Sequence, residues 1–303
     1  MNIDLDKIAT EQSNPATQAI DNVSTLEMVT IMNREDHRVA DAVGETLPQI
    51  AAAIDMIAEV LHNGGRLIYI GCGTSGRLGI LDASECPPTF NVSPEMVQGL
   101  IAGGKNAVFQ AVEGAEDNRE LAQQDLKNIH LCSKDVLCGL AASGRTPYVL
   151  GGIAYAKNVG ARVISVTCCK GSAIDREADI GIAPQPGPEV VTGSTRLKSG
   201  TAQKMVLNML STGAMIRLGK VYGNLMVDMQ ATNEKLVRRC RRVVMSATGV
   251  NEEEAIAALE KCGYHCKTAI VMILCHTDQE GAATLLQHSD GRIAGAVCEQ
   301  NRA

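Results

Sequence analysis

The chain has 303 residues, a formal net charge of −6 at pH 7, and only 2% aromatic residues. Such an acidic chain is not expected to present a nucleic-acid surface, and its one dense basic run, "RRCRR" at 238–242, is typical of a solvated helix face. Several of its 11 cysteines lie in predicted core elements, so we expect reduced thiols that pack as small hydrophobic side chains, as for Cys72, Cys138, Cys168 and Cys169.

An N-terminal helical segment is predicted over residues 1–56. In "STLE", Ser24 can cap a helix with Glu27 three residues later, and "LPQIAAAIDMIAEVLHNGG" has apolar positions at helical spacing before a Gly-Gly stop. The terminus has no basic stretch followed by an apolar one, and the chain has no apolar run of the roughly 18 residues that a membrane helix needs. We therefore expect a soluble, cytoplasmic protein.

A domain of alternating strands and helices is predicted over residues 57–222. Five short apolar runs are typical of buried strands: 66–71, 96–102, 135–141, 162–167 and 178–183. Helical patterns lie between them, in "SGRLGILDASE", "NAVFQAVEGAEDNRELAQQDLKN" and "TPYVLGGIAYAKNVG". This alternation predicts an α/β fold with a parallel sheet covered on both faces and a ligand at the carboxyl ends of its strands.

A C-terminal helical domain is predicted over residues 223–303. A long helix at 199–219 leads to it, and the strand-like runs then stop. Four helical stretches follow, one of which begins with Asn251 as a cap before three glutamates.

Three strand-to-helix junctions share a composition suited to phosphate: "GCGTSGR" (71–77), "AASGRTP" (141–147) and "VVTGSTRLKSGT" (190–201). Glycine lets the backbone approach a ligand closely, a helix N-terminus offers N–H groups, and hydroxyls add donors. Arg77, Arg145 and Arg196 could add charge or make structural salt bridges. The alternative is that all three junctions are ordinary tight turns.

The first junction has the G-x-G-x-x-G spacing of a dinucleotide loop at Gly71, Gly73 and Gly76. Such a site also calls for an acidic residue about 20 positions later. The corresponding strand runs into "IAGGKNAV", whose only charged residue is Lys105, and the chain has no G-x-x-x-x-G-K-[ST] motif. The loop is therefore better suited to one phosphate monoester than to a dinucleotide or ATP.

Two glutamates stand beside these loops. Glu85 follows the first predicted helix, and Pro87-Pro88 is expected to end that helix and hold Glu85 rigidly, either as a site residue or as a surface residue. Glu116 lies with Glu113 and Asp117 on one face of a predicted helix, a pattern that by itself favours a solvated acidic face.

The loops "GCGTSGRLG" and "AASGRT" resemble the sugar isomerase (SIS) domain. Over roughly residues 10–275 the chain closely resembles the N-acetylmuramic acid 6-phosphate etherase family, through "TEQSNPAT", "STLEMV", "GTSGRLGILDASECPPTF", "GLIAGG", "AVEGAEDN", "AASGRTPYV", "EVVTGSTRLKSGTAQK" and "GNLMVDMQATNEKL". The resemblance implies a three-layer α/β fold with a five-stranded parallel sheet of SIS type at 57–222, N-terminal helices and a small C-terminal helical unit. It also implies a homodimer in which neighbouring chains complete each site.

The family cleaves the D-lactyl ether of N-acetylmuramic acid 6-phosphate with water, giving N-acetylglucosamine 6-phosphate and D-lactate, in cell-wall amino-sugar recycling. Its proposed acid and base glutamates correspond to Glu85 and Glu116. In the open-chain sugar the C1 aldehyde acidifies the C2 proton, so a base can remove it while an acid protonates the departing ether oxygen. By resemblance Glu85 is the acid and Glu116 the base, and no metal or cofactor is needed.

The phosphate does not react, but its binding can hold the sugar between the two carboxylates. We assign it to the hydroxyls of Thr74, Ser75, Ser143 and Thr146, with Ser194 and Thr195 as weaker candidates.

Two other functions remain open at this point. A non-catalytic sugar-phosphate sensor, like the glucokinase regulatory protein, would keep the phosphate loops but would not need both glutamates. An aldose–ketose isomerase also needs a base at C2, and only the etherase-like strings around the glutamates argue against it.

Overall fold

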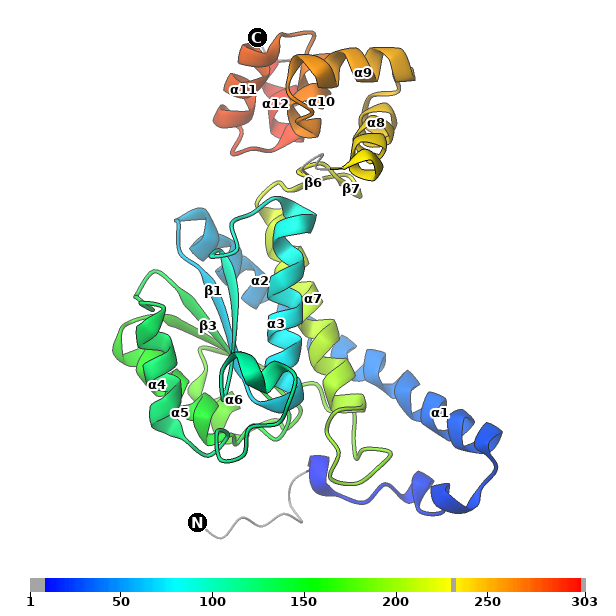
Figure 1. The fold of residues 1–303 in the computed structure, drawn as a ribbon, viewed down its shortest axis with the longest axis vertical. Coiled ribbons are helices and arrows are strands. Elements are labelled where there is room, and N and C mark those ends of the chain that lie inside the picture. The colour runs from blue at the N-terminus through cyan, green and yellow to red at the C-terminus, as the bar shows by residue number, and fades with distance from the viewer. Residues whose placement is uncertain (1–8, 230–232, 301–303) are drawn as a thin grey trace. The chain divides into compact units, whose positions relative to one another are not determined.

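In the computed structural model, residues 67–182 contain a five-stranded parallel sheet with the strand order β2-β1-β3-β4-β5 (Figure 1). The strands are β1 (Leu67–Gly71), β2 (Val97–Ile101), β3 (Val136–Ala141), β4 (Arg162–Thr167) and β5 (Ile180–Ile182). All five predicted strands are confirmed, with ends within two residues of the expected ones. Because every pairing is parallel, their carboxyl ends meet at one edge of the sheet.

The structure describes residues 9–229 and 233–300. The chain divides into two compact units: the first runs to Ser84 and resumes over Pro94–Ser211, and the second comprises Glu85–Ser93 and the chain from Thr212 onward. Parts of the expected N-terminal segment (1–8) and of the expected C-terminal domain (230–232 and 301–303) lie outside the described residues. The expected boundaries at 56/57 and 222/223 stay predictions.

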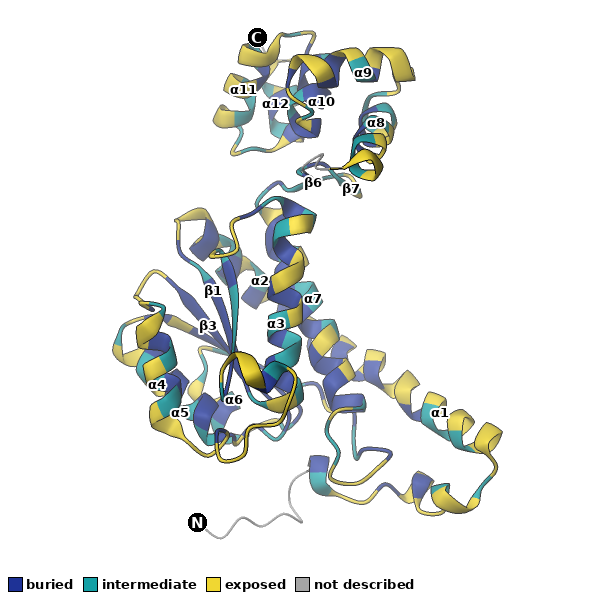
Figure 2. Cartoon of the chain, in the orientation of Figure 1, coloured by how far each residue is buried: buried dark blue, intermediate teal, exposed yellow. Residues whose placement is uncertain are grey.

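Helices cover both faces of the sheet, which is why its strands are apolar on both sides. On one face α4 (Arg119–Asn128) and α5 (Pro147–Asn158) pack on buried side chains such as Ile70 and Leu137. On the other, α3 (Gly73–Phe90) lies so close to β1 that a Cβ atom on Gly79 would lie 2.9 Å from Cβ of Tyr69. Figure 2 shows β1 and β3 as buried, and every residue of these two strands is buried. A short helix, α6 (Ala173–Glu177), follows β4.

Two helices form the N-terminal segment after three 3₁₀ turns, at Ala9–Glu11, Pro15–Thr17 and Ile20–Asn22. They are α1 (Thr25–Gly44) and α2 (Leu47–His62). The predicted cap is confirmed, since the Ser24 side chain accepts a hydrogen bond of 3.3 Å from the Glu27 N–H. The helical conformation is interrupted between α1 and α2. Pro48 stands in the first turn of α2, where proline is tolerated.

The first helix of the sheet domain, α3 (Gly73–Phe90), does not end before the double proline as predicted. It continues through Pro87 and Pro88 and ends where Asn91 has φ 52°, after the Asn91 N–H donates to the carbonyl of Pro87 at 2.9 Å. A proline φ of about −65° fits a helix, although each proline removes one N–H donor and its ring crowds the carbonyl four residues earlier. The prediction that Glu85 follows a terminated helix is therefore wrong.

The helix predicted over 106–128 is also wrong in its first half. Residues Lys105–Val108 form a 3₁₀ turn, and a helix, α4, resumes only at Arg119. Gly114 has φ 75° within the intervening turns, and the Asn118 side chain accepts a hydrogen bond of 2.9 Å from the Leu121 N–H. A left-handed glycine and a capping asparagine both oppose a continuous helix, so Glu116 lies in a turn and not on a helical face.

A buried carboxylate joins α3 to its neighbours within the first unit. Asp82 accepts hydrogen bonds from Tyr69 of β1 at 3.0 Å, and from Asn208 at 2.8 Å and Ser211 at 3.1 Å on α7 (Lys198–Arg217). Burial raises the pKa of Asp82, and these donors together with the charge of Lys204 offset only part of that effect.

The start of α7 is fixed by two more buried carboxylates. Glu189 accepts hydrogen bonds of 2.9 Å from the backbone N–H groups of Lys198 and Ser199. The ammonium of Lys198, fully buried, donates to Glu35 of α1 at 2.6 Å, and Asn14 donates to the same oxygen at 2.8 Å. Burial alone would raise the pKa of Glu35, but the hydrogen bonds from Lys198 and Asn14 and the positive charge nearby lower it overall.

The second unit contains a small hairpin and five helices. They are β6 (Val221–Tyr222), β7 (Leu225–Met226), α8 (Glu234–Thr248), α9 (Glu252–Lys261), α10 (Cys266–Leu274), α11 (Gln279–His288) and α12 (Ile293–Gln300). The predicted cap of α9 is confirmed, with Asn251 accepting from the Glu254 N–H at 2.9 Å. Across the described part of the chain, no helix combines the length and the apolar character that crossing a membrane requires.

We predict that Asp82→Ala lowers the free energy of unfolding by about 3 kcal/mol, because it removes a buried acceptor that three side chains share. Urea unfolding followed by circular dichroism measures this change. Asp36→Ala, at an exposed position of α1, is the control and should change stability by less than about 0.5 kcal/mol. Equal effects of the two substitutions would contradict the role given to Asp82.

Candidate active site

The turn from β1 into α3 is tight and built on glycine. A Cβ atom on Gly76 would lie 2.7 Å from the carbonyl oxygen of Gly71, so no larger residue fits without a shift of the backbone. Gly73, with φ 50°, is exposed and has open space around it. The start of α3 can therefore be approached closely by a ligand, as the sequence predicted.

The two hydroxyl residues of this turn differ in their surroundings. Thr74 is half-buried and lies against the start of α7, where a Cβ atom on Gly200 would lie 3.4 Å from its methyl carbon. Ser75 is buried and donates its hydroxyl proton to Gln203 at 2.8 Å, while Gln203 donates to the carbonyl of Val166 at 3.2 Å. Ser75 thus links α3, α7 and β4, and its hydroxyl oxygen is left with acceptor capacity.

The turn from β3 into α5 likewise requires glycine. Gly144 has φ 66°, and a Cβ atom there would lie 2.0 Å from the hydroxyl oxygen of Ser172. Beside it, Ser143 is half-buried and Arg145 is exposed. The left-handed φ and the close Ser172 side chain together disfavour any residue with a Cβ atom at 144.

Thr146, at the end of this turn, contacts Glu116. Its hydroxyl donates to the Glu116 carboxylate at 3.0 Å, and the N–H of Tyr148 donates to the Glu116 carbonyl at 2.9 Å. These two bonds fix the turn that carries Glu116 to the start of α5. The structure thus brings together two of the residues singled out in the sequence, and the Glu116 side chain is exposed.

A cavity of about 130 Å³ lies beside Glu116, within the first unit. Its lining includes Cys72 and Gly73 from the β1 turn, Ala102 after β2, and Val112 and Glu116. This volume is well below the 300–1,000 Å³ of typical small-molecule pockets, so it can hold only part of a sugar phosphate.

Cys72 is a residue of this cavity that the sequence did not mark as part of the site. Burial, followed by the negative charges of Glu116 and Asp117, raises the pKa of Cys72 to about 12. The thiol is therefore neutral at physiological pH and is not a nucleophile. In the sequence, the position of Cys72 between Gly71 and Gly73 could have identified it as a residue of the site.

Arg77 serves the structure of the site. Its guanidinium donates to the carbonyls of Val108 at 2.7 Å and Ala107 at 2.8 Å, at the 3₁₀ turn that lines the cavity. The sequence left open whether Arg77 adds charge to the site or makes a structural salt bridge. These bonds favour a structural role, with carbonyls and not a carboxylate as the partners.

The third junction differs from the first two. Glu189, which the sequence did not mark, occupies the first N–H groups of α7, so they are not available to a phosphate. Ser194 and Thr195 are half-buried in the preceding loop, and Arg196 is exposed.

Glu85 belongs to the second unit and is an exposed residue of α3. It follows Gly73 by twelve residues in one helix, which at 1.5 Å per residue is about 18 Å along the axis. It shares an exposed stripe with Leu81, Ser84 and Pro88.

Among the described residues, no cluster of three or more His, Cys, Asp or Glu side chains could hold a metal ion.

Two family models match the sheet region of the chain. One is described as the glucokinase regulatory protein N-terminal SIS domain and matches residues 49–157, and the other is described as the SIS domain and matches residues 114–213. A solved structure of a candidate phosphosugar isomerase involved in capsule formation from Bacteroides fragilis is similar with a TM-score of 0.51 and 21% identity, over 66% of this chain and 95% of that one. This similarity supports the fold alone.

Curated relatives match almost the whole chain. The N-acetylmuramic acid 6-phosphate etherase of Clostridium beijerinckii is 61% identical over 98% of both chains. N-acetylmuramic acid 6-phosphate etherase 1 of Vibrio cholerae is 58% identical over 99% of this chain and 100% of its own length.

We predict that iodoacetamide at pH 7.5 alkylates the exposed Cys132 and Cys298 at least about tenfold faster than Cys72, because only the thiolate reacts. Peptide mass spectrometry over a time course measures the three rates. Comparable labelling of all three thiols at pH 7.5 would contradict the neutral, protected state of Cys72.

Proposed function

The chain belongs to the N-acetylmuramic acid 6-phosphate etherase family, and we propose that Glu85 and Glu116 are its catalytic carboxylates. It is a carbon–oxygen lyase that cleaves the D-lactyl ether of N-acetylmuramic acid 6-phosphate with water, giving N-acetylglucosamine 6-phosphate and D-lactate, in amino-sugar recycling. The high identity to curated etherases along nearly the full length carries this conclusion. The predicted α/β fold of SIS type is confirmed.

An ether oxygen is a poor leaving group, so the reaction needs both a base and an acid. The base removes the C2 proton, which the C1 aldehyde of the open-chain sugar acidifies, and the acid protonates the ether oxygen as D-lactate leaves C3. Water then adds across the C2–C3 double bond. One carboxylate and one carboxylic acid suffice for these transfers.

Glu116 is the proposed C2 base. Its carboxylate lies at the cavity beside the β1 turn, and the Thr146 hydroxyl orients it through the bond of 3.0 Å. A base must be held within hydrogen-bond reach of the proton that it removes, and a fixed carboxylate meets this requirement better than a freely rotating one.

Glu85 is the proposed acid, which protonates lactate and later activates water. Glu85 lies about 18 Å along the helix axis from Gly73, so it is far from a ligand bound at the β1 turn of its own chain. We propose that a second copy of the chain supplies Glu85 to the site, as in a homodimer. The small cavity supports this, as do the exposed apolar side chains Leu26 and Val29 on α1 and Leu81 on α3. Figure 2 shows α1 exposed along most of its length.

The phosphate of the substrate is proposed to bind Thr74, Ser75, Ser143 and Thr146 at the two glycine turns. Thr74 and Ser143 are half-buried and stand beside glycines that leave the backbone approachable. The first N–H groups of α3 add donors at the positive end of the helix dipole. Ser75 and Thr146 already donate to Gln203 and Glu116, so they would contribute through backbone N–H groups or by exchanging partners.

We also propose a cytoplasmic location. All 11 cysteines lie within the described residues and are free thiols, which suits a reducing compartment.

We predict that Glu85→Gln and Glu116→Gln each lower kcat for D-lactate release by at least about 100-fold, because each removes one proton-transfer group. Exchange of the C2 proton with solvent deuterium, followed by NMR, separates the roles: it should be lost in Glu116→Gln and retained to a larger extent in Glu85→Gln. Glu45→Gln, at an exposed glutamate after α1, is the control. Normal C2 exchange in Glu116→Gln would overturn its assignment as the base. Folded, phosphosugar-binding protein without any lactate release would instead indicate a sensor or an isomerase.

Mixing the two inactive variants tests the shared site. If each site takes Glu116 from one copy and Glu85 from the other, random pairing of equal amounts restores about a quarter of wild-type activity, since half of the dimers then carry one intact site. Subunits are exchanged in mild denaturant and D-lactate is assayed after refolding. No recovered activity, with exchange verified by mass spectrometry, would show that both glutamates act within one chain.

A further inference from the structure

The cavity beside Glu116 holds only part of a sugar phosphate, and its size indicates which part. Its volume of about 130 Å³ is room for about four water molecules, at roughly 30 Å³ each. The acetamido group on C2 of the substrate has a similar number of non-hydrogen atoms, whereas the sugar ring with its phosphate is far larger. A substituent of the ring, and not the ring itself, therefore matches this volume.

Most of the lining consists of short side chains without charge. Ala102, Ala107 and Ala115 are buried, and Cys72 adds a neutral thiol, which packs as a small hydrophobic group. The other uncharged side chains of the lining are Ala111 and Val112, both exposed. Walls of this kind suit a methyl group, and they give few hydrogen bonds to a hydroxyl or a charged group.

Hydrogen bonds and close packing hold these walls in place. The Ala102 N–H donates to the carbonyl of Gly71 at 3.0 Å. Val112 packs against Gly103, where φ is 87° and a Cβ atom would lie 2.7 Å from Cβ of Val112. A cavity with fixed walls does not expand readily around a longer group, so it can select its occupant by size.

The proposed chemistry brings the acetamido group to this cavity. Glu116, the proposed base for the C2 proton, is part of the lining. The acetamido nitrogen is bonded to the same carbon as that proton. A sugar whose C2 proton points at Glu116 therefore carries its acyl group beside the cavity.

The D-lactyl group matches this cavity less well because it carries a carboxylate. The negative charges of Glu116 and Asp117 act inside the cavity, since both contribute to the raised pKa of the Cys72 thiol. Arg77 also lines the cavity, but it donates to backbone carbonyls. An uncharged acyl group avoids the repulsion that an anion would meet beside these carboxylates.

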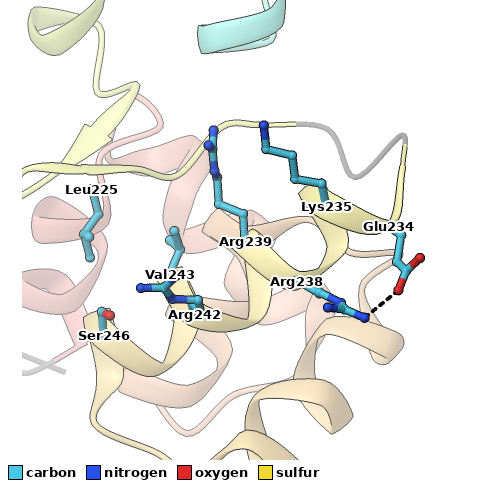
Figure 3. A pocket seen from close by; sticks show the side chains of 8 residues that line it. All are labelled: Leu225, Glu234, Lys235, Arg238, Arg239, Arg242, Val243 and Ser246. Atoms are coloured by element: carbon cyan, nitrogen blue, oxygen red, sulfur yellow. Dashed lines mark hydrogen bonds and ion pairs between the residues drawn. The ribbon is translucent and has the colours of Figure 1, made fainter.

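A larger cavity, in the second unit, has a different lining. It has a volume of about 730 Å³ and lies on α8, where Figure 3 shows Lys235, Arg238, Arg239 and Arg242 among its side chains. Such a lining attracts charged groups and does not select an uncharged acyl group by its length. The short apolar walls beside Glu116 are thus particular to that cavity.

We propose that the cavity beside Glu116 is the pocket for the N-acyl group of the substrate, and that Ala111 and Val112 limit the length of the acyl chain that it accepts. This inference rests on the proposed role of Glu116 as the C2 base.

A series of substrates tests the pocket in the unaltered protein. D-lactate release is measured for muramic acid 6-phosphates that carry N-formyl, N-acetyl, N-propionyl and N-butyryl groups. We expect kcat/KM to be at least about fourfold lower for N-formyl than for N-acetyl, because one buried methyl group is lost. It should be at least about 20-fold lower for N-butyryl, because the walls are fixed. Equal kcat/KM along the series would overturn the proposal.

Two substitutions should change this selectivity in opposite directions. Val112→Ala enlarges the cavity and should raise the ratio of kcat/KM for N-butyryl to that for N-acetyl at least about fivefold. Ala111→Leu fills the cavity and should raise KM for the N-acetyl substrate at least about fivefold. Ala154→Leu, at an exposed position of α5 outside the lining, is the control for the second change.

The ratio compares two substrates with one preparation, so it does not depend on the fraction of the protein that is folded. An unchanged ratio in Val112→Ala, together with an unchanged KM in Ala111→Leu, would contradict the proposal. If the two variants instead changed only the preference between D-lactyl and glycolyl ethers at C3, the cavity would belong to the leaving group and the proposal would be wrong.

Binding without catalysis separates this proposal from the role of Glu116. N-acylglucosamine 6-phosphates lack the lactyl group, and their inhibition constants should follow the same order of acyl groups. Acyl selectivity that persists while Glu116→Gln retains C2 exchange would support the pocket and remove only the assignment of the base. Inhibition constants that do not depend on the acyl group, with C2 exchange lost in Glu116→Gln, would overturn the pocket and leave the base in place.

Discussion

Parallel strand pairing is the constraint on which the active site depends. With all five strands in one direction, the turns after β1, β2 and β3 open at the same edge of the sheet, and residues far apart in the chain meet there. The contact between Thr146 and Glu116, and the nearness of Cys72 to the Glu116 charge, follow from this register. The glycines at 76 and 144 then bring backbone closer than any side chain would allow.

Buried carboxylates hold the helices that carry these turns. Asp82 ties α3 to β1 and α7, Glu189 occupies the first N–H groups of α7, and Glu35 binds the buried ammonium of Lys198. Removing one partner from such a group leaves an uncompensated polar atom or charge, which costs more than the bond itself contributes. The scaffold around the site is therefore specified by polar contacts as well as by its apolar core.

The strands and most helices could be predicted because their signals are local: apolar runs, caps and glycine stops. α3 could not, since a double proline is a local stop signal that the packing of the whole helix overrides. The turn around Glu116 was hidden by acidic residues at helical spacing, although Gly114 and Asn118 were visible. Glu35, Asp82 and Glu189 were missed because their partners include residues far away in sequence, and no pattern in one chain records such pairs. The roles of the glutamates came from family resemblance.

Cleavage in water enriched in ¹⁸O tests the central claim most directly, because it shows which carbon–oxygen bond breaks. N-acetylmuramic acid 6-phosphate is converted by the wild-type protein, and the isotopic masses of both products are measured by mass spectrometry. Elimination from C3 followed by hydration predicts solvent oxygen on the sugar product and none in D-lactate. Solvent oxygen in lactate would mean displacement at the lactyl carbon, a reaction that needs no C2 base and would leave the proposed role of Glu116 without a basis.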